Sequence, residues 1–158
     1  MSRTISLQFA SSLHSSREAV WEWITSVEGI RAEMRPVLRM TVPKSLRGLA
    51  DVQITPGRRL FRSLVLLFGI VPIDYSDLTL IEMRMGEGFI EQSPMGSMLL
   101  WRHERRIVAD HADPAGVILV DRLTFQPRGA ATLVGWFVKR FFEHRHAVLR
   151  AHFGSVAV

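Results

Sequence analysis

The sequence contains no cysteine, and only Lys44 and Lys139 are lysines among its 20 basic residues. The absence of cysteine excludes disulfide bonds, thiolate metal ligands and cysteine nucleophiles, and makes a reducing cytoplasm the expected compartment. The longest apolar run, residues 64–72 (LVLLFGIVP), is about half as long as a helix that spans a bilayer. The N-terminus, MSRTISLQF, lacks the apolar stretch and cleavage site of a signal peptide. Export and membrane spanning are therefore not expected.

The charge of the chain is positive but dispersed. Its formal net charge is +5, and the basic residues lie singly among acidic ones without a nucleic-acid-binding motif. A nucleic-acid partner requires a concentrated basic surface, so we expect no nucleic-acid binding. No cluster of His and carboxylate residues has the spacing of a metal site, and we expect neither a metal nor another cofactor. At 158 residues, 47% of them hydrophobic, the chain has room for one domain with a large core or an apolar pocket.

The longest helical pattern lies between residues 128 and 153, and Gly154 provides a stop after it. It predicts a helix of about 23 residues, roughly 35 Å long. One broad arc of this helix carries Leu133, Val134, Phe137, Val138, Phe141, Val148 and Leu149, and the opposite side carries Lys139, Glu143, His146 and Arg150. Arg145 and His152 lie inside the apolar arc. Because a buried charge needs a partner or a wet cavity, either Arg145 pairs with a carboxylate on a sheet below, or the helix covers a partly polar ligand cavity.

The N-terminal part reads as a strand followed by two short helices. Residues 4–9 alternate between apolar and polar side chains, which predicts a half-buried strand. Ser15 or Ser16 can cap the first helix, and Glu18 has the spacing of a capping box with Ser15. We expect Glu28 and Gly29 to interrupt this helix, and a second piece over residues 30–34 to end before Pro36.

Strand patterns dominate from residue 38 to residue 126. The predicted strands cover residues 38–42, 59–70, 78–85, 88–93, 97–108 and 116–126. Residues 59–70 fit a helix equally well, and we choose the strand. Residues 43–57 read as a loop whose VQIT segment could form a brief strand. Short connections between consecutive strands indicate an antiparallel meander with one covered face, and hence an α+β fold.

Polar residues on neighbouring strands form the main candidate site. Alternation places Trp101, His103 and Arg105 on one face of the strand over residues 97–108, and the next strand offers Asp121 between two leucines. A histidine and an arginine beside a carboxylate can form a charge-assisted network, orient a ligand carbonyl or transfer a proton. The alternative is ordinary cross-strand pairing on a wet sheet face, and the sequence leaves both open.

Two further polar residues have ordinary explanations. Glu33 falls where the short helices should approach the sheet, but it fits a solvated helix position as well. Ser97 occurs with His103 and Asp121, yet the GxSxG motif of a nucleophile elbow is absent, so we do not expect a hydrolase.

Four segments, VWEWITSVEGIRAEMRP, WRHERRI, VDRLTFQPRG and FFEHRHAVLRAHFG, together with the order of elements, resemble the START-like polyketide cyclase and lipid-transport (SRPBCC) superfamily in its bacterial small-domain branch. The resemblance covers nearly the whole chain. It implies a helix-grip fold, in which a curved antiparallel sheet of about seven strands wraps a long C-terminal helix. It also implies two short helices after the first strand and one START-like ligand-binding domain over residues 1–158.

Members of this superfamily bind hydrophobic molecules in a cavity between the sheet and the long helix, and some cyclise or dehydrate polyketides. By position, the resemblance places six residues near the cavity: Trp101, His103, Arg105, Asp121, Phe141 and Arg145. We therefore expect a lipid, polyketide or isoprenoid-like ligand in a pocket bordered by Phe137 or Phe141 and by the strand of Trp101. Trp101, Phe137 and Phe141 would pack against the ligand, and His103 and Arg145 would hydrogen-bond to it.

Two other functions stay open. A polyketide cyclase or dehydratase would use His103 as general base, with Asp121 setting its orientation. A peripheral lipid or quinone carrier would touch a membrane transiently through residues 64–72. The sequence favours no oligomeric state.

Overall fold

The computed structural model describes residues 3–49 and 52–154, which form three helices and a seven-stranded antiparallel sheet. The elements are β1 (Ile5–Leu13), α1 (Arg17–Thr25), α2 (Val27–Met34), β2 (Leu38–Met40), β3 (Arg59–Leu67), β4 (Val71–Arg84), β5 (Gly88–Gln92), β6 (Met98–Ala109), β7 (Val117–Pro127) and α3 (Ala131–Phe153). The strand order is β1-β7-β6-β5-β4-β3-β2, so the sheet is a meander in which β1 adds to the edge of β7.

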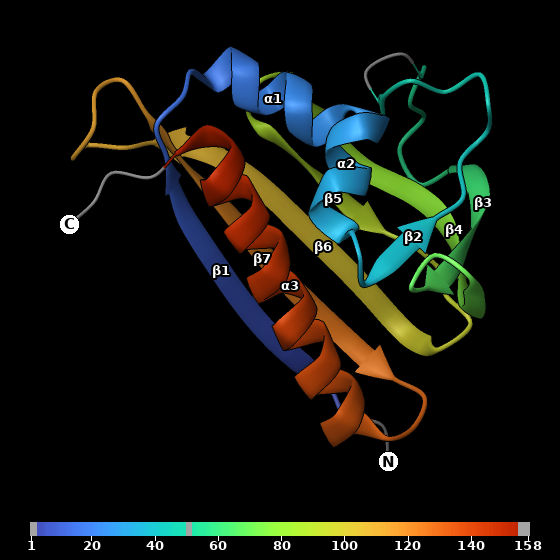
Figure 1. Cartoon of the computed structure of the whole chain (residues 1–158). Helices are drawn as coiled ribbons and strands as arrows, with labels where there is room; N and C mark the ends of the chain where they lie inside the picture. Colours follow the sequence, from blue (N-terminus) through green and yellow to red (C-terminus); the bar gives the residue numbers. More distant parts are fainter. Residues whose placement is uncertain (1–2, 50–51, 155–158) are drawn as a thin grey trace.

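The sheet curls around the C-terminal helix. Figure 1 shows α3 crossing the concave face in front of β1 and β7, with α1 and α2 beside its C-terminal half. The predicted α+β helix-grip fold is confirmed. No helix within the described ranges has the length and apolarity needed to cross a bilayer.

Period-two alternation builds the covered face of β7. Along this strand every second residue is buried: Val117, Leu119, Asp121, Leu123, Phe125 and Pro127. In β6 the buried residues His103, Arg105 and Ile107 alternate in the same way, and Arg105 is the register partner of Asp121. The predicted grouping of His103, Arg105 and Asp121 on one face is confirmed, and that face is the concave one.

The long helix matches its predicted length of about 23 residues and ends at Phe153, and Gly154, with a φ of 80°, caps it. Its buried arc differs from the prediction. His146, expected on the solvent side, is buried, whereas His152 is exposed and stacks on Trp23 with 3.9 Å between ring centroids. Leu133 is also exposed. The arc is rotated because α3 packs against both α2 and β1, and β1 contacts the side of the helix that carries His146.

The two short helices meet at Ser26, not at Glu28 and Gly29 as predicted. The hydroxyl of Ser26 donates to Trp23 O at 2.8 Å and accepts from Gly29 N at 2.9 Å, so one residue ends α1 and caps α2. Ser16 caps α1 and accepts from Ala19 N at 3.1 Å, so the capping box of Ser15 and Glu18 is not formed.

The strand predictions hold with shifted ends. Residues 59–67 form a strand as chosen, but residues 68–70 form a turn, and β4 begins at Val71 and not at residue 78. The first half of β4 was missed because its exposed and polar residues hide the alternation. The VQIT segment, residues 52–55, belongs to the loop.

Two apolar clusters form the core. One lies under α1 and includes Leu13, Val20, Ile24, Leu119 and Leu149. The other lies under α3 and includes Leu123, Phe125, Val138, Phe141 and Phe142. Neither cluster fills the space between α3 and the β2–β4 part of the sheet.

Candidate ligand-binding site

A cavity of about 440 Å³ lies between α3 and the sheet. Its walls are mainly apolar and come from α2, from β2 to β6 and from the N-terminal half of α3; they include Met34, Met40, Val65, Met95, Met98, Trp101, Val134, Phe137, Val138, Phe141 and Phe142. We call this space the main cavity. The prediction of a pocket bordered by Phe137 or Phe141 and by the strand of Trp101 is confirmed.

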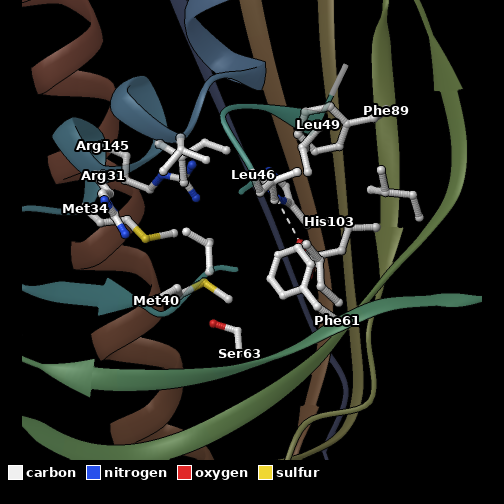
Figure 2. A pocket seen from close by; sticks show the side chains of 16 residues that line it. Arg31, Met34, Met40, Leu46, Leu49, Phe61, Ser63, Phe89, His103 and Arg145 are labelled. Carbon is white, nitrogen blue, oxygen red and sulfur yellow. Dashed lines mark ion pairs between the residues drawn. The ribbon is translucent and has the colours of Figure 1, made fainter. Parts of the chain in front are cut away.

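A smaller space of about 100 Å³, the side cavity, adjoins the main one beneath α2 and the loop that carries Leu46 and Leu49. Five residues line both spaces, and we call them the neck: Met34, Met40, Glu91, His103 and Arg145. Figure 2 shows Arg145 on one side of the side cavity, with His103 and Phe61 opposite. Three polar side chains, Glu91, His103 and Arg145, therefore lie where the two spaces meet. Arg31 and Ser63 line the side cavity alone, and Asp74, Ser76 and Ser97 line the main cavity alone.

Behind the neck lies a buried ion network centred on Arg105, which has no solvent exposure. Its Nε donates to Asp121 Oδ1 at 2.7 Å and its Nη2 to Asp121 Oδ2 at 2.8 Å. On the other side, Nη1 and Nη2 donate to Glu33 at 3.0 and 2.8 Å. Pairing on a wet sheet face and a solvated Glu33 are both wrong, because α2 closes over this part of the sheet and excludes water from both carboxylates.

Two histidines complete the hydrogen bonds of Asp121. The Nε2 atoms of His103 and His146 each lie 2.7 Å from its carboxylate. Since Asp121 accepts, both rings donate through Nε2, and in a neutral ring Nδ1 is then an acceptor. His146 Nδ1 lies 2.7 Å from the hydroxyl of Ser11. His103 Nδ1 lies 3.8 Å from Glu91 Oε1, too far for a hydrogen bond, and the ring lines the cavity.

Arg145 pairs with Glu33, to which its Nε donates at 3.2 Å. The prediction placed its partner on the sheet; the partner is on α2, because α2 packs against α3 directly. The guanidinium also lies over the Phe142 ring, 5.0 Å from its centroid. Within the described ranges, the other two guanidinium nitrogens of Arg145 make no hydrogen bond. They are donors that a ligand in the neck can use.

The buried charges determine one another's ionisation. Burial alone would raise the pKa of Glu33, but Arg105 and Arg145 lower it by more. The pKa of Asp121 is held well below its usual range, because Arg105 and His103 outweigh its burial. Burial lowers the pKa of Arg145, partly opposed by Glu33. Burial would also lower the pKa of Arg105, but Asp121 and Glu33 raise it overall. At neutral pH the network is therefore two carboxylates facing two guanidinium groups.

The structure brings most of the predicted site residues together. Five of them line the main cavity: Trp101, His103, Phe137, Phe141 and Arg145. Arg105 and Asp121 do not line it; they lie behind His103 and hold its ring. Glu91 was missed, although its place two residues after Phe89 in an apolar strand was a signal. Its carboxylate accepts from the hydroxyl of Ser93 at 2.7 Å.

The model of a family described as "Domain of unknown function (DUF8410)" matches residues 11–153. No curated protein matches the sequence. Among solved structures, protein CV1439 from Chromobacterium violaceum has a TM-score of 0.69 at 11% identity, with 94% of this chain and 96% of that chain covered.

Two further solved structures have the same fold. A START superfamily protein from Mycobacterium smegmatis has a TM-score of 0.64 at 9% identity, covering 94% of this chain and 96% of that one. The Zhui aromatase/cyclase from Streptomyces sp. R1128 has a TM-score of 0.64 at 12% identity, covering 95% and 93%. These likenesses confirm the START-like fold.

Proposed function

The chain belongs to the DUF8410 family, and from the cavity that its fold encloses we propose that it binds a small hydrophobic ligand as a single START-like domain over residues 1–158. The observation that carries this proposal is the main cavity. Its volume of about 440 Å³ lies within the range of small-molecule sites, about 300–1,000 Å³, and its walls combine aromatic rings and methionines with a few convergent polar groups. A lipid, a polyketide or an isoprenoid-like molecule has the matching chemistry.

The ligand lies with its apolar body against Trp101, Phe137 and Phe141, and with one polar group at the neck. Arg145 offers N–H donors there, whereas Glu91 and His103 Nδ1 offer acceptors. A hydroxyl group satisfies both kinds of partner. A carboxylate does not, because the guanidinium groups of Arg31, Arg105 and Arg145 are already matched by the carboxylates of Glu33, Glu91 and Asp121, and another negative charge would have no partner. The neck therefore selects a neutral alcohol over an acid.

The geometry of His103 supports a second candidate, a cyclase or dehydratase. Its Nε2 is held by Asp121 at 2.7 Å, and the ring lines the cavity, which is the arrangement of a general base oriented by a carboxylate. An aromatase/cyclase shares the fold. Binding ranks first because Asp121 is also bonded to Arg105 and His146, so the same contacts serve a buried network without any reaction.

A substitution that fills the main cavity tests this proposal. Val134 lines it, whereas Thr132, on the same helix, is exposed and outside it. Val134→Trp adds a ring to the cavity and Thr132→Trp adds the same ring to the solvent face. We expect Nile red, a neutral apolar fluorophore, to bind the wild type and Thr132→Trp equally and Val134→Trp at least about tenfold more weakly. Equal binding by all three proteins would remove the main cavity from the proposal.

Competition then tests the polar group. Dodecanol should displace Nile red at lower concentration than dodecanoate, which has the same chain length. The reverse order would overturn the assignment of a neutral head group and leave the cavity itself intact. For the second candidate, His103→Gln should weaken dodecanol binding, with no product from aromatic polyketide surrogates in either protein. A product that forms with the wild type and is lost in His103→Gln would favour the cyclase.

A further inference from the structure

Exposed apolar side chains lie at the mouth of the main cavity and in the nearby turn between β3 and β4. In the turn between β3 and β4, Phe68 and Ile70 are 65% and 77% exposed. Ile73 on β4 and Leu133 and Trp136 on α3 are also largely exposed, and these three line the main cavity, so they mark its opening. We call the set Phe68, Ile70, Ile73, Leu133 and Trp136 the mouth patch. Phe68 lies near this opening, because it shares a surface depression with Leu38, which lines the main cavity. Exposed apolar side chains gathered near an opening are typical of an interaction surface.

The backbone holds Phe68 outward. Its φ of 54° is positive, which is unfavourable for a residue with a side chain, and Gly69 follows with a φ of 78°. The amide of Phe68 donates to Val37 O at 2.8 Å, which fixes the turn against the chain leading into β2. Because most of the Phe68 side chain is exposed, packing against the described residues does not explain why an aromatic residue occupies this unfavourable conformation. Contact with an apolar environment outside the chain explains it.

Three arginines lie beside the mouth patch. Arg31, Arg35 and Arg39 line a surface depression of about 380 Å³ together with Phe68 and Gly69. The ion pairs formed within the described ranges use other arginines and include none of these three. Arg35 and Arg39 are exposed, whereas Arg31 is half-buried and also lines the side cavity. The depression therefore presents two exposed guanidinium groups with a third arginine at its inner edge, the chemistry that binds phosphate.

We propose that the mouth patch and the three arginines dock the protein on an anionic phospholipid bilayer. Phe68 and Ile70 enter the interface, and lipid phosphates occupy the arginine depression. Charge complementarity favours this partner over a second copy of the chain, because a two-fold interface through this face would bring two sets of the same arginines together. The docking surface does not depend on which ligand the main cavity holds.

Co-sedimentation of the full chain with vesicles tests the proposal. We expect binding to vesicles of phosphatidylcholine with phosphatidylserine and little binding to phosphatidylcholine alone. Phe68→Ser/Ile70→Ser should bind at least about tenfold more weakly. Arg35→Gln/Arg39→Gln should bind about 25-fold more weakly, since each arginine near an anionic surface contributes roughly fivefold.

Matched controls lie elsewhere on the surface. Met85 is exposed in the turn at the opposite end of β4, and Met85→Ser should bind like the wild type. Arg58→Gln/Arg122→Gln removes the same charge from two other exposed positions and should lose much less than Arg35→Gln/Arg39→Gln. Equal losses in both arginine pairs, or wild-type binding by Phe68→Ser/Ile70→Ser, would overturn the proposal. The proposal would also be overturned if light scattering showed that the wild type is a dimer and that Phe68→Ser/Ile70→Ser dissociates it. Nile red binding is measured for every variant as well. Because it reports on the main cavity, it separates a failure of membrane docking from a failure of the cavity proposal.

Discussion

Arg105 allows two carboxylates to stay charged without solvent. Glu33 and Asp121 are both fully buried, and the guanidinium group between them donates to each through paired N–H groups. The planar fork of an arginine can serve two carboxylates in this way, whereas a lysine ammonium cannot. Asp121 in turn fixes His103, so the orientation of a ring at the neck depends on charges that never touch the cavity.

Removing one carboxylate from this network should be costly. Glu33→Gln leaves Arg105 and Arg145 buried with only Asp121 to balance them, and breaking a buried pair costs about 3–5 kcal/mol. We expect the free energy of unfolding in urea to fall by that amount. Glu28→Gln, an exposed change on the same helix, should cost less than about 1 kcal/mol. Similar losses in the two variants would show that the pairs of Glu33 contribute little to stability.

The same carboxylates predict the response to acid. The pKa values of Glu33 and Asp121 are lowered in the folded protein from their ordinary 4.5 and 3.8. As the pH falls through those ordinary values, the unfolded chain takes up protons that the folded protein does not, so the free energy of unfolding must decrease. Urea unfolding between about pH 6 and pH 3 should show this decrease, steepest below about pH 4.5. A stability that is level or rises toward pH 3 would mean that these groups are not paired in solution.

At the scale of the elements, periodicity predicted which residues lie on the buried face of each strand or helix. The alternation in β6 and β7 correctly placed His103, Arg105 and Asp121 on one face, and the apolar arc of α3 correctly turned Phe137, Phe141 and Arg145 inward. The resemblance to the START-like superfamily supplied the arrangement of the sheet around the long helix. The face on which a residue lies depends only on its neighbours in the chain, so the sequence pattern of one element is enough to predict it.

The errors concern contacts between distant elements. Glu33 and Arg105 are 72 positions apart, and only the packing of α2 over the sheet reveals that they pair. His146 looked solvent-facing by polarity, yet β1 supplies Ser11 and β7 supplies Asp121 as its partners. A polar residue with buried polar partners has the same sequence pattern as a solvated one. The polar part of the candidate site was therefore less predictable than its apolar walls.

At the scale of the whole molecule, the two halves of the sheet are supported differently. Strands β1 and β7 pack directly under α3, and their buried residues belong to continuous apolar clusters. Strands β2, β3 and the first half of β4 face the main and side cavities through residues such as Met40, Ser63, Val65 and Ser76. A strand with a cavity on its inner face lacks packing partners there, so it should open at lower free energy than β7.

Amide hydrogen exchange should resolve this difference. We expect the amides of β7 to exchange only through global unfolding and those of β3 to exchange through smaller, local openings. Saturation with dodecanol should slow exchange in β3 and the first half of β4 more than in β7, because a molecule in the cavity supplies the missing contacts. Val134→Trp gives the internal control, since a ring fixed in the main cavity should protect β3 without any ligand. Uniform protection of β3 and β7 in the free wild-type protein would mean that the cavity is closed in solution by a rearrangement of the sheet, and that ligand entry must reopen it.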